Sequence, residues 1–188
     1  YTTEHTLSLH DALPISMALE SINVNSADIN SAFELWPDMP MDMMGLFFFA
    51  YRDFVRGSDA VLEKKGFGRA HHRVLYFVNI RPGMPVADLL GILKITKQSL
   101  ARVLRQLIDE GYIEQSPGEV DRRQRLLYAT GKGKALFEEL SRLQAERINR
   151  ALSALSEEDA KAVRGFLATM VDPEDRATLD QLRLTTSL

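Results

Sequence analysis

Hydrophobic residues recur at helical spacing over most of the chain from residue 41 onward. Apolar side chains return every three or four positions in residues 41–65, and the same period continues in residues 69–80. Glycines separate the two stretches, and an Arg-Pro-Gly sequence ends the second, as expected where helices stop. We therefore predict two helices, followed by a short extended piece at residues 84–86.

The next block predicts a helix-turn-helix. Residues 87–93 have the length of a two-turn helix, and residues 97–110 predict a longer helix that ends at a glycine. Thr96 is a favourable N-cap for the longer helix. Only three residues connect the two helices, so the connection is tight.

A β-hairpin is predicted directly after this motif. Residues 112–115 and 126–129 are rich in strand-forming side chains, and a Pro-Gly pair turns the chain between them. The segment between the turn and the second strand is charged. The order helix, turn, helix and hairpin predicts a mainly α-helical fold with a small β-hairpin wing, a winged helix-turn-helix with a helical dimerisation region.

Two further helices are predicted towards the C-terminus. A long helix is expected to begin after Gly131 and Gly133, with apolar positions up to Leu155. Ser156 is expected to cap a final helix whose first turn is acidic. Pro173 ends that helix or begins a short tail.

The two faces of the predicted helix at residues 97–110 differ in chemistry. One face is apolar: Leu100, Val103, Leu104, Leu107 and Ile108. The opposite face is basic and polar: Lys97, Gln98, Ala101, Arg102 and Arg105. Lys, Arg and Gln can bind phosphates or base edges, and the hydroxyls of Thr96 and Ser99 lie at the helix N-terminus, which suits phosphates. Alone, this face could equally be an ordinary solvated surface.

Positive charge is concentrated in residues 94–134. This stretch has nine Lys or Arg and five Asp or Glu, a balance of +4 in a chain of net charge -3. The hairpin tip holds Arg122, Arg123 and Arg125 beside Asp121. Guanidinium groups on a thin loop can enter a minor groove or bind its phosphates. A solvated tip is the alternative, but the basic helix face and the basic tip together favour DNA binding.

The segment from residue 69 to residue 136 resembles the winged-helix core of the MarR family of regulators. The most specific match is Asp121-Arg122-Arg123 followed by an apolar strand, Thr130 and a glycine. The resemblance implies that Asp121 orients Arg123 and that Arg123 contacts DNA. Ala129 departs from the family, which usually has Leu there, and the long segment before Met41 is a second departure.

The resemblance also implies a homodimer held by the first and last helices. Phe47, Phe48 and Phe49 support this independently, because a small winged core has no room for so many aromatic side chains. A two-fold dimer would place two recognition helices about 34 Å apart on a pseudo-palindromic operator. Completion of an intrachain core is the alternative.

Relatives in the family often bind small aromatic or phenolic effectors between the dimer helices and the winged core. The candidate lining residues in this chain are Trp36, Met44, Tyr51, His72 and Arg73. Several methionines lie near Trp36, and we favour packing over ligand binding for them. An effector would act by shifting the spacing of the two recognition helices.

Composition excludes several other functions. The chain has 188 residues and no cysteine, so disulfides, thiolate metal sites and thiol oxidation switches are excluded. His71 and His72 are adjacent and point apart on a helix, and the Gly-Lys repeat at residues 131–134 lacks the spacing of a phosphate loop. We expect no metal, no cofactor, no membrane span, no enzymatic activity and a cytoplasmic location.

The expected domain organisation follows from these elements. Its parts are a non-native leader at residues 1–16, an N-terminal arm at 17–40, a helical dimerisation region at 41–66 and 134–188, and a DNA-binding core at 67–133. The expected function is that of a DNA-binding transcriptional regulator, a repressor relieved by an effector. The alternative is a winged helix that binds another protein rather than operator DNA.

Overall fold

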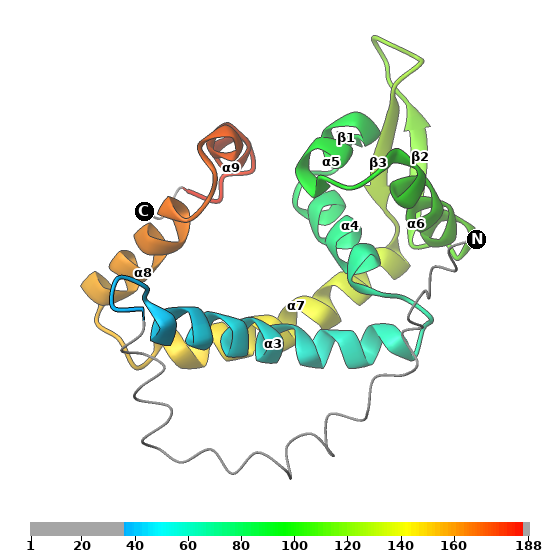
Figure 1. The fold of residues 1–188 in the computed structure, drawn as a ribbon. Coiled ribbons are helices and arrows are strands. Elements are labelled where there is room, and N and C mark those ends of the chain that lie inside the picture. Colours follow the sequence, from blue (N-terminus) through cyan, green and yellow to red (C-terminus); the bar gives the residue numbers. More distant parts are fainter. Residues whose placement is uncertain (1–35, 186–188) are drawn as a thin grey trace, which may run out of the picture. The chain divides into compact units, whose positions relative to one another are not determined.

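The computed structural model describes residues 36–185, and Figure 1 labels the helices and strands. The chain divides into two units, residues 1–49 and residues 50–188. The elements are α3 (Met41–Glu63), α4 (Arg69–Ile80), β1 (Met84–Pro85), α5 (Val86–Leu93), α6 (Lys97–Asp109), β2 (Ile113–Pro117), β3 (Arg125–Ala129), α7 (Gly131–Leu152), α8 (Glu157–Thr169), η1 (Pro173–Asp175) and α9 (Arg176–Gln181). The leader predicted at residues 1–16 and most of the arm predicted at residues 17–40 lie outside the described residues.

The predicted fold class is confirmed, a mainly helical chain with a small antiparallel sheet. The second helix has the predicted bounds, and Thr96 and Ser156 cap α6 and α8 through their side-chain oxygens. No helix within residues 36–185 is long and apolar enough to cross a membrane.

Three predictions of local structure were incomplete or wrong. α7 begins at Gly131 rather than after Gly133, because the Thr130 side chain accepts the Gly133 N–H and caps the helix earlier. The hairpin is part of a three-stranded sheet, since β1 pairs with β3. From Pro173 onward the chain folds into η1 and α9, where the sequence predicted the end of the last helix or a short tail.

The sheet has the strand order β1-β3-β2, so β3 lies in the centre. β2 and β3 pair antiparallel with Gln115 opposite Leu127, and β1 adds Met84 opposite the same Leu127. Leu127 and Met84 are fully buried. The short β1 therefore ties the start of the helix-turn-helix to the base of the wing.

The core of the second unit lies beneath α6. The apolar side chains of α6 at Leu100, Val103, Leu104 and Leu107 are buried as their spacing predicts, together with side chains of α4, α5 and α7. Burial of each such side chain contributes about 1.5–3 kcal/mol. Ile108, predicted on the same face, is only partly buried. Burial of the apolar face fixes the rotation of α6 about its own axis, and the basic face on the opposite side therefore points to solvent.

The C-terminal end of α6 is closed by a Schellman motif. Gly111 has φ of +74°, a conformation that favours glycine. Its N–H donates to the carbonyl of Ile108, and the N–H of Tyr112 donates to the carbonyl of Leu107 at 2.8 Å. Tyr112 and Leu107 are both buried, which supplies the apolar contact that usually accompanies this motif.

The start of α7 is locked against this helix end at what we call the Thr130 junction: Gly111, Tyr112, Thr130, Lys132 and Gly133. The Thr130 hydroxyl donates to the Gly111 carbonyl at 2.7 Å. Lys132 Nζ donates to the carbonyl of Glu110 at 2.8 Å and lies 4.1 Å from the centre of the Tyr112 ring. A Cβ at Gly133 would lie 2.0 Å from the Tyr112 carbonyl oxygen, so only glycine fits.

This contact predicts that Gly133→Ala destabilises the fold. The methyl group would force the backbone of α7 away from Tyr112, and overpacking of this kind costs about 1–3 kcal/mol. The matched control is Gly131→Ala, because a Cβ there meets nothing within 4 Å. Thermal unfolding followed by circular dichroism should show a lower Tm for Gly133→Ala and an unchanged or higher Tm for Gly131→Ala. Equal Tm values for the two variants would contradict the role of the junction.

Candidate nucleic-acid interface

The outward face of α6 carries the side chains expected for base and phosphate contacts. Lys97, Gln98, Ala101, Arg102 and Arg105 are all exposed. They form one stripe because α6 is an unbroken helix whose opposite face is buried. The small side chain of Ala101 lies in the middle of the stripe, where it leaves the helix backbone accessible to a partner.

The hydroxyl groups at the start of α6 are engaged with each other. Thr96 Oγ1 accepts the backbone N–H of Ser99 at 3.1 Å, and the Thr96 hydroxyl donates to Ser99 Oγ at 2.9 Å. Thr96 therefore serves first as the cap that fixes where α6 begins. Phosphate binding at this end would rest on the backbone N–H groups of the first turn, which have no acceptor within the helix.

The wing tip is held by its own backbone. The N–H of Arg123 donates to Asp121 Oδ1 at 2.9 Å, and the N–H of Gln124 donates to the Asp121 carbonyl at 3.0 Å. A Cβ at Gly118 would lie 2.6 Å from that same carbonyl, so the turn requires glycine. Asp121 thus fixes the backbone from which the Arg123 side chain projects.

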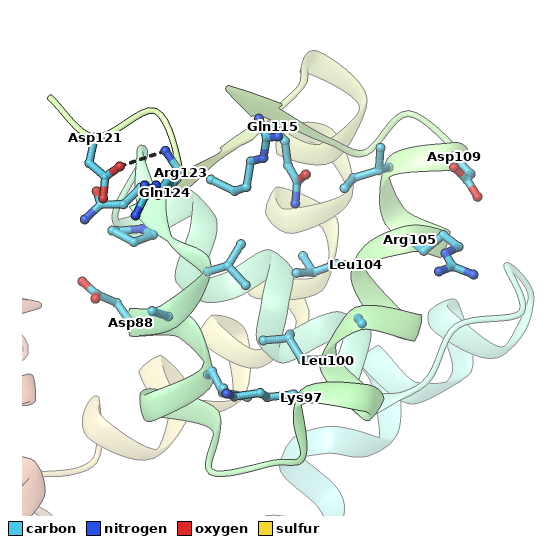
Figure 2. Close-up of a pocket in the computed structure, with 17 residues that line it drawn as sticks. Asp88, Lys97, Leu100, Leu104, Arg105, Asp109, Gln115, Asp121, Arg123 and Gln124 are labelled. Atoms are coloured by element: carbon cyan, nitrogen blue, oxygen red, sulfur yellow. Dashed lines mark hydrogen bonds between the residues drawn. The ribbon is translucent and has the colours of Figure 1, made fainter. Parts of the chain in front are cut away.

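A groove runs between α6, the N-terminal end of α5 and the wing (Figure 2). It encloses about 760 Å³, and its floor is apolar, with Leu90, Leu100 and Leu104 among its lining residues. Cations from both predicted elements line it: Lys97 and Arg105 come from α6, and Arg123 and Arg125 come from the wing. Figure 2 shows Arg123 of the wing on a different side of the hollow from Lys97 and Arg105 of α6.

Gln98, Arg102 and Arg122 do not line the groove, although all three are exposed. Sequence reasoning in turn missed several polar side chains that do line it: Asp88, Asp109, Gln115 and Gln124. No alternation along β2 marks Gln115, because Glu114 beside it is exposed as well and Ser116 is not buried. The wall formed by α5 could not be foreseen, because it depends on how the helix packs beside β1.

The six basic side chains of this surface, the interface cations, are Lys97, Arg102, Arg105, Arg122, Arg123 and Arg125. None of them forms an ion pair with a residue in the described range 36–185. Some cations elsewhere have carboxylate partners: Arg69 lies 2.8 Å from Asp59, and Arg81 lies 3.0 Å from Asp88. The interface cations therefore hold their charge available for an external anion.

α6 is also fixed from its inner side by His71. The N–H of Gly68 donates to His71 Nδ1 at 3.0 Å, and His71 Nε2 lies 2.9 Å from Gln106 Oε1. Gln106 Nε2 continues the chain of hydrogen bonds to Glu110 at 3.0 Å. Because Nδ1 accepts, Nε2 carries the proton and donates to Gln106. This network ties the start of α4 to the C-terminal half of α6.

Comparison with known proteins agrees with this geometry. The model of the MarR family matches residues 65–124, from the connection after α3 to the wing tip. The helix-turn-helix-type transcriptional regulator PetP of Rhodobacter capsulatus is 43% identical over 136 residues, 72% of this chain and 82% of that protein. BilQ of Clostridium symbiosum, another such regulator, is 28% identical over 109 residues, 58% of this chain and 76% of that protein.

This chain belongs to the MarR family of winged-helix transcriptional regulators. Solved MarR-type structures share the fold. A mutant of MepR from a multidrug-resistant S. aureus clinical isolate superposes with a TM-score of 0.61 at 22% identity, over 70% of this chain and 96% of that one. SlyA gives a TM-score of 0.58 at 20% identity, over 76% of this chain and 98% of that one.

Membership of the MarR family makes this chain a DNA-binding transcriptional regulator, and its curated relatives are regulators rather than enzymes. The contributions of individual residues to DNA binding remain predictions. The structure shows where those residues lie: Thr96, Lys97, Gln98, Ser99, Arg102 and Arg105 on α6 or at its cap, and Asp121, Arg122, Arg123 and Arg125 on the wing.

The five effector candidates of this MarR-family chain lie in both units. Trp36 and Met44 belong to the first unit and are about half exposed. In the second unit, Tyr51 is exposed, with Arg69 Cζ 5.8 Å from its ring centre, and Arg73 is exposed. His72 is buried, and this burial lowers its pKa below the ordinary histidine value. None of the five lines the groove between α6 and the wing.

Proposed function

We propose that this protein binds a pseudo-palindromic operator as a homodimer and represses transcription until a small-molecule effector relieves it. The observation that carries the proposal is the set of interface cations. Within the described residues they have no ion-pair partner, and four of them line one groove whose floor is apolar. Such an arrangement suits a phosphate backbone that passes between α6 and the wing.

The proposed contacts divide between positioning and sequence reading. Lys97, Gln98 and Arg102 would reach base edges in the major groove, because they lie near the N-terminal end of the exposed face of α6. Arg122 and Arg123 project from a thin tip, which suits the minor groove and its phosphates. The cytoplasm, where the operator would be found, is the proposed location.

A homodimer is supported by apolar surface that the single chain leaves exposed. In the first unit, Phe47 and Phe48 of α3 are 47% and 69% exposed. In the second unit, α8 and its C-cap expose a further set: Val163, Phe166, Leu167 and Met170. Groups of large apolar side chains exposed to water are typical of protein–protein contact surfaces. A two-fold axis would set the two recognition helices about 34 Å apart, one turn of DNA.

The effector part of the proposal concerns a small aromatic or phenolic molecule that would contact Tyr51, His72 or Arg73 in the second unit. Trp36 and Met44 in the first unit stay candidates from the sequence alone. The exposed Tyr51 ring offers a stacking surface, and the exposed Arg73 offers a cation for an acidic or phenolic oxygen. The alternative function, a winged helix that binds another protein, would leave the interface cations dispensable and binding almost independent of salt.

DNA binding can be tested by fluorescence anisotropy with duplex DNA from the region upstream of the gene. If at least six phosphates are contacted, affinity should fall by roughly a thousandfold or more between 50 and 200 mM salt. Arg123→Ala should weaken binding by about 1–3 kcal/mol, because it removes a wing contact. Arg142→Ala is the matched control, an exposed arginine of α7 that lies outside the interface. Equal losses in both variants, or salt-independent binding, would reject the proposed interface.

The homodimer predicts a clear effect of Phe48→Glu. A charge placed in the proposed apolar contact should raise the dimer dissociation constant at least tenfold in sedimentation equilibrium, since burying an unpaired charge is costly. Val120→Glu makes the same chemical change at the fully exposed wing tip and should leave the dimer intact. A monomeric wild-type protein, or a Phe48→Glu variant as dimeric as wild type, would refute the dimer.

A further inference from the structure

Lys94 occupies the turn of the helix-turn-helix, three residues before α6 begins. It follows α5 as its C-cap and adopts the left-handed conformation, with φ of 48° and ψ of 41°. Non-glycine residues adopt this conformation uncommonly. Here the Lys94 N–H donates to the Leu90 carbonyl and ends α5. Lys94 differs from the interface cations in one respect: carboxylates of the chain already neutralise its charge.

Two carboxylates from the C-terminal end of the chain bind Lys94. Lys94 Nζ donates to Glu174 Oε1 at 2.6 Å and to Asp175 Oδ2 at 2.8 Å. The hydrogen bonds to Asp175 and Glu174 raise the pKa of Lys94. Asp172 lies in the same group, since one oxygen from each of the three carboxylates lies within 4.8 Å of the others. Lys94, Glu174 and Asp175 form what we call the Lys94 ion-pair cluster.

The segment that supplies these carboxylates rests on the winged-helix core. Leu182, just after α9, packs against the buried core. Thr178 and Gln181 of α9 line a hollow together with Gly91 and Ile92 of α5. The C-terminal segment is therefore held against the winged-helix core by the apolar contact of Leu182 as well as by charge, and it brings negative charge to the turn that precedes α6.

The ion pairs of this cluster can exchange with an external anion. The side chain of Lys94 is 49% exposed and that of Glu174 is 72% exposed, so water and ions reach both. Exposed ion pairs contribute little net stability and are screened by salt. A DNA phosphate offers the same negative charge and hydrogen-bond acceptors as the carboxylates, so it can replace them at Lys94.

We propose that the acidic C-terminal segment is an autoinhibitory element, in which Glu174 and Asp175 hold Lys94 and compete with DNA phosphate for it. While the two ion pairs persist, the ammonium group of Lys94 is withheld from DNA, and once the segment is released it binds a phosphate. Release of the segment strengthens DNA binding and makes it more sensitive to salt. This inference rests on the proposed DNA interface of α6 and the wing.

The test is a double-mutant cycle on the full-length chain, with anisotropy measured against the upstream duplex and a scrambled duplex from 50 to 200 mM salt. The double variant Glu174→Gln with Asp175→Asn should tighten binding roughly threefold to tenfold, and the slope of log K against log salt should steepen by about 0.9 for one new phosphate contact. Adding Lys94→Gln to it should abolish both gains. Asp172→Asn is the matched control, because it removes a charge from the same segment without breaking a bond to Lys94.

The competing outcomes are distinct. Unchanged or weaker binding by the double variant would overturn the autoinhibition, as would gains that persist in the presence of Lys94→Gln or appear equally in Asp172→Asn. Equal affinity of wild type for the upstream and scrambled duplexes would instead count against the proposed operator. In that case the salt slopes on either duplex would still show whether Lys94 gains a phosphate contact. Absence of all DNA binding would overturn both proposals.

A second measurement does not require DNA. Reductive methylation of the free protein, analysed by mass spectrometry, should modify Lys94 faster in the double variant than in wild type, because its ammonium group loses two partners. Lys132, which is bonded to the Glu110 carbonyl, is the internal reference and should react at the same rate in both proteins. Equal rates at Lys94 would show that the cluster does not hold the side chain in solution.

Discussion

Three contacts made by neighbouring residues join the end of the recognition helix to the start of α7. The Thr130 hydroxyl binds the Gly111 carbonyl, Lys132 binds the Glu110 carbonyl, and Gly133 leaves room for the Tyr112 carbonyl where no Cβ could fit. These contacts hold the C-terminal end of α6, the strands at the base of the wing and the first turn of α7 in fixed positions relative to one another. The recognition helix and the wing can act as one surface because this junction allows little relative movement between their bases.

Electrostatics then distinguishes two sets among the basic residues of the described chain. Arg69, Arg81 and Lys94 have carboxylate partners and link elements of the second unit. The interface cations have none among residues 36–185, although acidic side chains such as Asp109 and Asp121 lie along the same groove. A net charge of -3 for the whole chain thus coexists with a local surface suited to a polyanion.

Periodicity and capping predicted most elements from residue 41 onward. The inward face of α6 was predicted because four leucine and valine side chains recur on one side, and Thr96 marked its start. The start of α7 was misplaced because Gly131 and Gly133 were interpreted as helix breakers, whereas Gly133 is required by its contact with Tyr112. α9 was missed because its stability depends on packing against distant parts of the chain, which a local pattern does not reveal.

The candidate site was predictable in its residue types and only partly in its geometry. The sequence indicated the cations of α6 and the wing, and the structure brings four of them around one groove. It did not indicate the part of α5 in that groove or the pairing of Lys94 with a segment 80 residues away. Such contacts follow from tertiary packing, so neither hydrophobic period nor motif spacing could have located them.

In the proposed dimer, α6 of each protomer reads the major groove and the wing of each protomer binds the flanking minor groove. Dimethyl sulfate protection on the upstream DNA tests this directly, because guanine N7 lies in the major groove and adenine N3 in the minor groove. The account predicts two clusters of protected guanine N7 about ten base pairs apart, each flanked by protected adenine N3. A single cluster, or protection confined to the minor groove, would contradict it.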